Sequence, residues 1–495
     1  MKKLISPLKA IIFIAAIFIF FSFSQATDNL TSSLKKAVDS IDPILPYQLA
    51  RTMSSPEFAG RLTGDQGFTK AARWAAAKFK EWGLRPVDRK NGYLQPYPSP
   101  YTIIDRASMI LYLPEKSGSG GNINYQKVEL SLEKDFLPLL FSDSGEKTAE
   151  LVFAGWGISA PELNYDDYAG VEVKGKFVLC FRGTPDPARQ EFQYYDEHRT
   201  RMKTAKEKGA LGIIYIYPEA QANPNGDWIA DFMPGVITEK TADLIFKEIN
   251  STTAELKKAL QTYKRPISFS LKSKLSYSVA SRHFPDGIGY NIIGWVEGSD
   301  PNLKKEIVVV GGHFDHCGRH AGLLFAGADD NASGSAVVMA AARTLSVSGL
   351  RPKRSVMFVL FGGEEMGLQG SSYFVEHLPA PINKVAAILN FDMEGEGDGA
   401  WCGMSAEPAQ LKELIEKANG YINVIKGMSV IKNVGVRGSD FAPFFLKGIP
   451  SASFGSNGPH FGYHTTGDTI YRLNPEIMGR IAQLAFLSAF YLADR

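Results

Sequence analysis

Cysteine is scarce in this 495-residue chain, which contains only Cys180, Cys317 and Cys402. Three cysteines cannot form the disulfide framework of a small secreted domain, and a chain of this length can bury a sizeable core without one. Cys317 and Cys402 both lie a few residues beyond candidate ligand residues, so one bridge between them is an alternative. The other alternative is that all three are buried free thiols.

Net charge is nearly absent as well, because 54 Lys and Arg residues face 52 Asp and Glu residues, which leaves a formal charge of +2. The sequence also lacks a basic cluster with interleaved aromatic residues. It therefore gives no indication of a nucleic-acid partner. A hydrophobic content of 44% and a length of 495 residues are typical of a globular protein with two or more domains.

Long apolar runs are missing after the first 26 residues. Those residues contain three early lysines, an apolar core at 10–23 and the small-x-small triplet Ser24-Gln25-Ala26. This pattern predicts a secretory signal peptide cleaved after Ala26, and thus a secreted or periplasmic protein without stable membrane insertion after cleavage. An uncleaved anchor is the alternative, although the apolar core is shorter than the ~20 residues that span a bilayer.

The pattern of predicted strands and helices changes twice along the remaining sequence. Residues 124–275 contain short apolar strands separated by turns and one helical stretch near 201–208, and no clustered His, Asp or Glu of ligand type falls inside these strands. From about residue 285 onward, apolar strands alternate with helical stretches, which predicts an α/β fold with a doubly wound, mixed but mostly parallel sheet. We therefore predict a domain with segments 27–123 and 276–495, interrupted by an inserted β-rich domain at 124–275.

Metal-type side chains follow three predicted strands. The run Ile307–Val310 precedes Gly311-Gly312-His313, the run Val356–Phe361 precedes Gly362-Gly363-Glu364-Glu365, and the run Val385–Phe391 precedes Asp392. In open α/β sheets, ligands bind in the crevice outside the carboxyl ends of the strands. We therefore expect these side chains to meet at one edge of the sheet.

Two more candidate ligands lie in the segments Gly327–Gly334 and Tyr463–Asp468. Two imidazoles and three carboxylates are a set that binds two borderline divalent ions, with one carboxylate bridging them. The predicted ligands are His313, Asp330, Glu365, Asp392 and His464.

The ordered motifs resemble the co-catalytic zinc aminopeptidases of the bacterial leucyl aminopeptidase and aminopeptidase Y family, which is related to glutamate carboxypeptidase. The resemblance implies a zinc exopeptidase fold, two Zn²⁺ ions per chain with Co²⁺ or Mn²⁺ as substitutes, and peptide substrates with a free N-terminus. It rests on His313-x-Asp315, Gly327-Ala-Asp-Asp-Asn-Ala-Ser-Gly334, Glu364-Glu365-x-Gly367, Asp392 and His464-Thr-Thr-Gly-Asp468.

The same resemblance implies a metal role for each ligand. Asp330 would bridge the two ions, His313 and Asp392 would complete one site, and Glu365 and His464 would complete the other. The choice between Asp329 and Asp330 as the bridge depends on this resemblance alone.

Three further residues receive catalytic roles from the resemblance. Glu364 would be the general base that takes a proton from the water between the metals. Asp315 would fix the His313 ring through its second nitrogen, as metal-bound imidazoles usually require. Tyr463 would donate to the oxyanion of the tetrahedral intermediate.

Three short segments resemble parts of a protease-associated (PA) domain: Phe153–Ile158, Tyr165–Gly170 and Lys174–Lys176. This resemblance implies that the insertion is a small, β-sandwich-like lid and not a catalyst. We expect its loops to border the pocket.

Other polar residues near the motifs have less specific interpretations. Asp468 could only cap a turn, the acidic loop 394–399 is expected to be a solvated turn, and Arg437 could touch substrate at the rim. His316, His320 and His460 could be bound only to solvent.

Two other functions stay open at this point. A glutamate-carboxypeptidase-like exopeptidase would need arginines facing the pocket, but Arg319 and Arg437 are the only arginines in the ligand-bearing loops. A non-catalytic binding protein on the same fold would be expected to have lost ligands, and none is missing here. The sequence does not indicate the oligomeric state.

Overall fold

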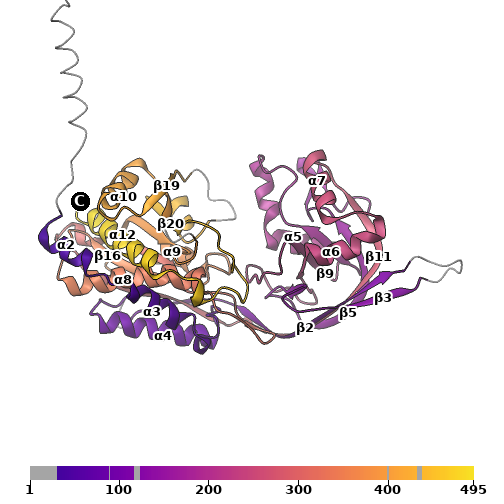
Figure 1. Ribbon diagram of the computed structural model, residues 1–495, viewed down its shortest axis with the longest axis horizontal. Helices are drawn as coiled ribbons and strands as arrows, with labels where there is room; N and C mark the ends of the chain where they lie inside the picture. The colour runs from indigo at the N-terminus through magenta and orange to yellow at the C-terminus, as the bar shows by residue number, and fades with distance from the viewer. Residues whose placement is uncertain (1–29, 88–89, 116–122, 398–400, 432–437) are drawn as a thin grey trace, which may run out of the picture.

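The computed structural model describes residues 30–87, 90–115, 123–397, 401–431 and 438–495, which form two units side by side (Figure 1). One unit contains the indigo N-terminal and the orange and yellow C-terminal segments, and the other contains the magenta middle of the chain. The predicted signal peptide at 1–26 lies outside the described residues. Among the residues that are described, no helix is long and apolar enough to cross a membrane.

The first unit is built on an eight-stranded mixed sheet, whose four central strands β16, β13, β17 and β20 run parallel. The outer strands β1, β12 and β18 join with antiparallel pairings. In sheet order the strands are β1 (Leu94–Pro98), β12 (Ile288–Val296), β16 (Ser355–Phe361), β13 (Glu306–His313), β17 (Lys384–Phe391), β20 (Ser451–Ser456), β18 (Cys402–Glu407) and β19 (Ile425–Ser429).

Helices cover both faces of this sheet because its central strands are apolar on both sides. In β13, Val308 and Val310 pack toward one layer of helices, while Ile307 and Val309 pack toward the other. This arrangement confirms the predicted doubly wound α/β fold. The first layer contains α2 (Ser32–Asp39), α3 (Ile44–Met53), α4 (Gln66–Glu81), α8 (Gly334–Ser348), α10 (Ala409–Ile422) and α12 (Pro475–Ala493), and the second contains α9 (Gln369–Glu376) and α11 (Ala442–Leu446).

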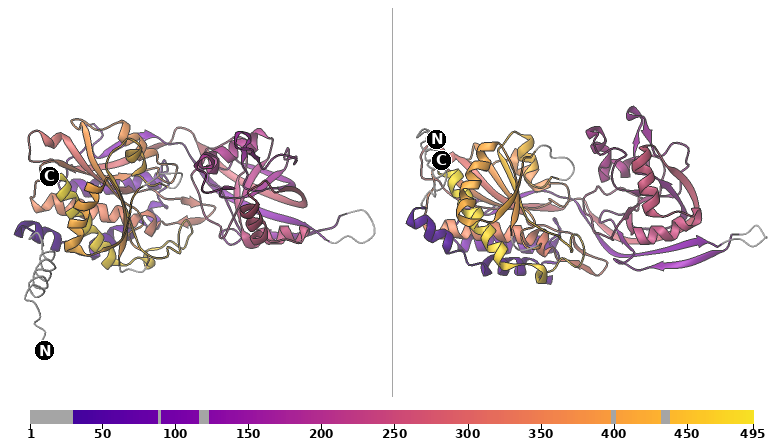
Figure 2. Two further views of the ribbon diagram at one scale, coloured as in Figure 1. Left: turned by 90° about the horizontal axis from the view of Figure 1, so that it is seen from above. Right: turned by 45° about the horizontal axis from the view of Figure 1, so that its top comes forward.

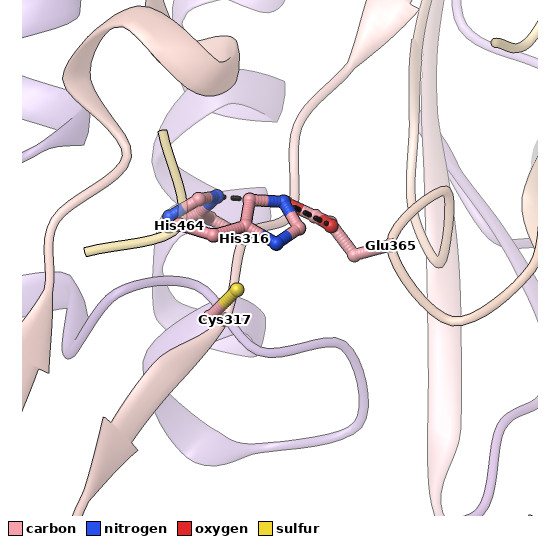
Figure 3. A group of neighbouring side chains, drawn as sticks. All are labelled: His316, Cys317, Glu365 and His464. Carbon is pink, nitrogen blue, oxygen red and sulfur yellow. Dashed lines mark hydrogen bonds and ion pairs between the residues drawn. The ribbon is translucent and has the colours of Figure 1, made fainter. Parts of the chain in front are cut away.

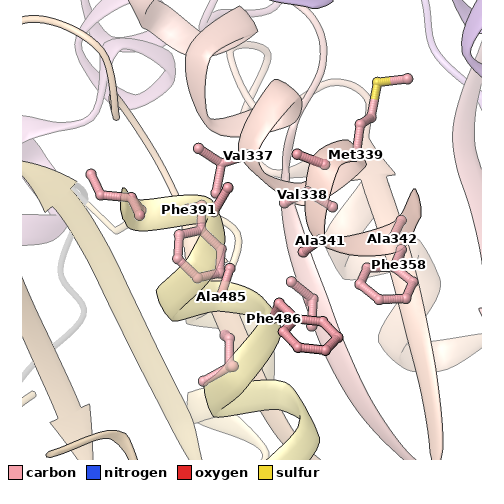
Figure 4. Close-up of a cluster of buried hydrophobic side chains, with 14 of the residues drawn as sticks. Val337, Val338, Met339, Ala341, Ala342, Phe358, Phe391, Ala485 and Phe486 are labelled. Carbon is pink, nitrogen blue, oxygen red and sulfur yellow. The ribbon is translucent and has the colours of Figure 1, made fainter. Parts of the chain in front are cut away.

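Small side chains bring α8 and α12 close to the sheet (Figure 4). Ala341 and Ala342 of α8 and Ala485 of α12 are fully or almost fully buried beside Phe358 of β16 and Phe391 of β17. Close packing of this kind fixes the strand ends that follow, because a well-packed interior leaves little room for displacement.

The second unit differs in part from the expected β-sandwich-like lid. It has one eight-stranded sheet with α5 (His198–Glu207) on one face and α6 (Glu239–Phe246) and α7 (Thr253–Tyr263) on the other, as Figure 2 also shows. The expected helix near 201–208 corresponds to α5. The helices α6 and α7 were missed, although the capping box of Thr252 and Glu255 marks the start of α7.

The second sheet also extends beyond the predicted insertion at 124–275, because its long strand β2 begins at Tyr101 and its long strand β11 ends at Phe284. The domain boundaries themselves stay a prediction. In sheet order its strands are β3 (Tyr125–Leu130), β2 (Tyr101–Pro114), β11 (Ser268–Phe284), β5 (Gly145–Ala154), β8 (Phe177–Phe181), β9 (Gly212–Tyr217), β10 (Gly235–Thr238) and β4 (Phe136–Pro138).

Two short hairpins complete the strands: β14 (Gly318–His320) pairs with β15 (Leu323–Phe325), and β6 (Ser159–Ala160) pairs with β7 (Tyr165–Asp166). The three cysteines are buried and free, so the alternative of a Cys317–Cys402 bridge is wrong. Cys180 lies in β8, Cys402 begins β18, and Cys317 directly precedes β14.

Candidate metal centre

Three of the predicted ligand segments meet at the carboxyl edge of the first sheet because their strands are neighbours. His313 ends β13, which lies between β16, followed by Glu365, and β17, followed by Asp392. Gly311 and Gly312 continue β13 as far as His313 itself. A side chain at Gly312 would bring its Cβ within 2.4 Å of the Phe391 carbonyl oxygen.

Asp330 reaches the same edge from the helical turn η6 (Ala328–Ser333), which leads into α8. The carboxylate of Asp468 accepts hydrogen bonds from the amides of Asp329 and Asp330, at 2.8 and 3.0 Å. Asp468 therefore holds this turn in place. The Asp329 side chain faces away, since it accepts from the Gly395 and Glu396 amides and contacts His460.

The two carboxylate oxygens of Asp330 each approach a different histidine. Oδ1 lies 3.2 Å from His313 Nε2, and Oδ2 lies 3.2 Å from His464 Nε2. Asp392 Oδ1 is 3.1 Å from the same nitrogen of His313, and Glu365 Oε2 is 3.0 Å from the same nitrogen of His464. The five predicted ligands thus form two half-sites that share Asp330.

The residues fit a pair of divalent ions. His464 Nε2 and Asp330 Oδ2 are buried and have no hydrogen-bond partner among the described residues, although they lie 3.2 Å apart. Buried polar atoms are almost always partnered, so orphaned atoms facing one another indicate a missing ligand. Imidazole nitrogens and carboxylate oxygens are donors that Zn²⁺ and similar ions accept.

The electrostatics of the carboxylates differ sharply. Burial would raise the pKa of Glu365, but the nearby His464 imidazole and a hydrogen bond from His316 lower it to about 2. Burial likewise opposes ionisation of Asp330, yet the adjacent imidazoles of His313 and His464 hold its pKa well below the ordinary value. The pKa of Glu364 is raised well above its ordinary value by burial. A carboxyl group with a raised pKa beside ionised ligands is suited to accept and return a proton.

A cavity of about 760 Å³ opens over these residues and is lined by both units. Its volume lies in the range of roughly 300–1,000 Å³ that is usual for ligand sites. Glu364 and Tyr463 line it beside the predicted ligands, and residues of the second unit form the opposite wall, among them Arg182, Tyr194, His198, Arg199, Asn223 and Asn225.

The Asp315 carboxylate was expected to contact the His313 ring, but it does not. Asp315 Oδ1 lies 3.9 Å from His313 Nδ1, whereas the backbone carbonyl oxygen of Asp315 lies at 3.3 Å. The chain turns directly after β13, which places the carbonyl nearer to the ring than the side chain. The carboxylate accepts a hydrogen bond from the Glu364 amide at 3.2 Å, so Asp315 supports the loop that carries Glu364.

Several polar side chains expected to be solvated are engaged with the protein. His316 Nδ1 is 2.8 Å from Glu365 Oε1 (Figure 3), and His320 bonds the Ile104 amide and the Cys317 carbonyl. In the acidic loop, Glu394 and Glu396 are buried, so the interpretation as a solvated turn is wrong for them. Arg437 lies outside the described residues, and Arg319 is exposed.

Comparisons with known proteins agree with this geometry. Residues 291–489 match the model of peptidase family M28. Leupeptin-inactivating enzyme 1 of Streptomyces exfoliatus is 32% identical over 215 residues, which cover 39% of this chain and 46% of that protein. An aminopeptidase of Pseudomonas aeruginosa is 27% identical over 385 residues, 73% of this chain and 62% of that protein. The chain therefore spans about half to three fifths of the length of these relatives.

A more distant relative is carboxypeptidase Q of Rattus norvegicus, 25% identical over 226 residues and 45% of each protein. Among solved structures, the aminopeptidase from Aneurinibacillus sp. strain AM-1 superposes with a TM-score of 0.64 at 22% identity, covering 93% of this chain and 96% of that one. At this level of identity the likeness shows the fold alone, and it confirms the predicted zinc exopeptidase type of fold. The family match at residues 291–489 does not include the second unit, whose sheet runs from Tyr101 to Phe284.

Proposed function

We propose that this protein is a secreted or periplasmic metal-dependent aminopeptidase that hydrolyses the N-terminal peptide bond of peptides. The observation that carries the proposal is the Asp330 carboxylate, whose two oxygens each face one histidine of a two-part ligand set. The M28 match over residues 291–489 and the relatives named aminopeptidase support it. The localisation rests on the signal-type sequence before Ala26.

Each residue has a definite task in this proposal. His313 and Asp392 would hold one ion, Glu365 and His464 the other, and Asp330 both. Two bound ions would supply an activated water and polarise the scissile carbonyl.

Glu364 and Tyr463 would act on the substrate from the cavity wall. The Glu364 carboxylate, kept basic by burial, would accept a proton and then return it to the leaving amine. Tyr463 lines the cavity, and its hydroxyl would donate to the developing oxyanion. The Asp315 carboxylate keeps the Glu364 backbone in position.

Metal analysis and an aminoacyl-anilide panel test the proposal. We expect about two zinc ions per chain, activity that a chelator removes and zinc restores, and refusal of amino-acetylated peptides. A free amine would be required because one ion of the proposed pair would hold it beside the scissile bond. Equal turnover of blocked and free peptides would contradict the assignment, and a protein that holds no metal would favour a binding role.

A glutamate-carboxypeptidase-like activity has one observation in its favour. Arg182 and Arg199 of the second unit do line the cavity, although no arginine cluster was found in the ligand-bearing loops. Both are already paired, however, Arg182 with Asp196 at 3.2 Å and Arg199 with Asp227 at 2.8 Å. An arginine with a carboxylate partner, such as Arg199, is a poor site for a substrate carboxylate, but Asp196 also pairs with Arg201 at 2.8 Å and therefore does not neutralise Arg182. Comparing peptides with free and amidated C-termini separates the two activities.

We also propose that the second unit is a PA-type lid that selects peptides by length. Its residues form the cavity wall opposite the predicted ligands. An Asn223→Ala, Asn225→Ala double variant should therefore change kcat/KM along a ladder of dipeptides to hexapeptides. An unchanged ladder would count against the lid role.

A further inference from the structure

A second group of potential ligands lies directly beside the proposed pair. His316, Cys317, Glu365 and His464 each offer one ligand atom, and these atoms all lie within 4.8 Å of one another (Figure 3). Figure 3 shows the sulfur of Cys317 directed toward the two imidazole rings. All four residues are buried.

Two nitrogens in this group lack partners. His316 Nε2 and His464 Nε2 are buried without a hydrogen bond to any described residue. The other nitrogen of His464 is already used, because Nδ1 donates to the Ala222 carbonyl oxygen at 2.8 Å. The group therefore presents a thiol, two imidazoles and a carboxylate, which is a complete four-ligand set for a borderline or soft divalent ion.

We propose that the ion held by Glu365 and His464 has two alternative positions in this protein. One position is completed by Asp330 and belongs to the proposed pair. The other is completed by His316 and Cys317 and lies outside that pair. Because both positions use Glu365 and His464, one ion excludes the other.

The choice between the positions depends on the chemistry of the metal. Carboxylate oxygens suit Mn²⁺, whereas thiolates select softer ions, for which Cd²⁺ is the probe. With a soft ion in the outer position, Asp330 would contact only the ion held by His313 and Asp392. The Cys317 thiol releases its proton to solvent as the sulfur–metal bond forms. The consequence for catalysis rests on the proposed function, but the binding itself does not.

A purely structural role is the competing explanation. Cys317 also packs in an apolar cluster with Phe325, as a buried thiol commonly does, and His316 also donates to Glu365. In that case the sulfur would never contact a metal.

Cadmium loading of the full chain distinguishes the two explanations. We expect the wild type to bind two Cd²⁺ ions and to show a thiolate-to-cadmium charge-transfer band in the ultraviolet. Cys317→Ser should lose the band. Its affinity for one of the two Cd²⁺ ions should fall by at least the roughly 10–100-fold that removal of an outer-shell partner costs. Cys180→Ser is the matched control, because Cys180 is also a buried free thiol, and it should keep the band.

Cys317→Ala repeats the test if the serine variant does not fold. Two bound Cd²⁺ ions without a thiolate band in the wild type, or the same band in Cys317→Ser, would overturn the proposal. The ratio of peptidase activity in the cadmium form to that in the zinc form should be higher for Cys317→Ser than for the wild type. If every form lacks peptidase activity, the aminopeptidase assignment fails, while the spectra still decide the position of the ion.

Discussion

The imidazole of His464 and the backbone of Ala222 form a reciprocal pair across the two units. His464 Nδ1 donates to the Ala222 carbonyl oxygen at 2.8 Å, and the Ala222 amide donates to the His464 carbonyl oxygen at 2.8 Å. A carbonyl oxygen can only accept, so Nδ1 carries the proton and Nε2 is left to face Asp330 and Glu365. The second unit therefore orients one proposed ligand without supplying a ligand itself.

Ala222→Pro should weaken one metal site selectively. Proline removes the amide that donates to His464, so the loop loses half of the pair that holds the ring. We expect the affinity for one of the two ions to fall by roughly 10–100-fold, as for other outer-shell changes. Equilibrium dialysis with zinc measures this, and Gln221→Ala is the control, because the Gln221 side chain contacts this loop through a long, 3.4 Å hydrogen bond to the Tyr463 carbonyl oxygen. Two ions held as tightly as in the wild type would contradict the coupling.

The sequence predicts the ligand edge well because each signal there is local. His313, Glu365 and Asp392 stand within four residues of an apolar strand end, and parallel neighbours bring such ends together. The supporting contacts could not be predicted in the same way. Ala222 acts through its backbone, and a backbone group leaves no mark on the sequence.

The role of Asp468 shows the same limit for a side chain. Its carboxylate binds the amides of Asp329 and Asp330, which lie more than a hundred residues earlier in the chain. An acidic residue after a predicted ligand is equally consistent with a turn cap. Only the fold brings the two segments together.

Arg61 is another support that local patterns do not reveal. Its guanidinium is fully buried and donates to four backbone carbonyl oxygens at 2.7 to 2.9 Å. Three of these belong to the loops beside His313 and Asp330. The four acceptors are the carbonyl oxygens of Met53, Phe314, Ala326 and Gly327.

Arg61→Met should destabilise the protein strongly, because it keeps an unbranched side chain but leaves the carbonyl oxygens of Met53, Phe314 and Ala326 without donors, whereas the Gly327 carbonyl keeps the Ala332 amide at 3.2 Å. Each unsatisfied acceptor costs about 1–3 kcal/mol, so we expect the free energy of unfolding to fall by roughly 3 kcal/mol or more. Urea denaturation measures the loss. Arg73→Met, on the exposed face of α4, should change stability by less than about 0.5 kcal/mol. Similar losses in both variants would argue against a special role for Arg61.

His320 should make the protein less stable in mild acid. Burial lowers the pKa of His320 to about 4, against an ordinary value of 6.5. Between these two values the unfolded chain binds a proton that the folded chain does not, so stability falls as pH falls below 6.5. From about pH 7.5 to about pH 5 the expected loss from this residue is about 2 kcal/mol.

Urea denaturation at both pH values, in the wild type and in His320→Gln, checks the His320 prediction. The variant should show a smaller difference between the two pH values, whatever its stability at neutral pH. His377 is an exposed histidine whose ring contacts its own helix, so His377→Gln serves as the control. An undiminished pH dependence in His320→Gln would show that other groups cause it.

Glu364 and Glu365 are neighbours with the same chemistry but different surroundings. Glu365 is buried between His316 and His464, whereas Glu364 is half-buried and lines the cavity. Glu364→Gln should keep both ions and lower kcat by the ~10²–10⁴-fold that general-base catalysis contributes, or by more where the base also returns the proton. Glu365→Gln should instead weaken the binding of one ion, so that excess zinc partly restores the activity of this variant. Metal stoichiometry and kcat measured for both variants decide the matter: if Glu364→Gln loses metal while Glu365→Gln keeps two ions, the base and the ligand are assigned the wrong way round.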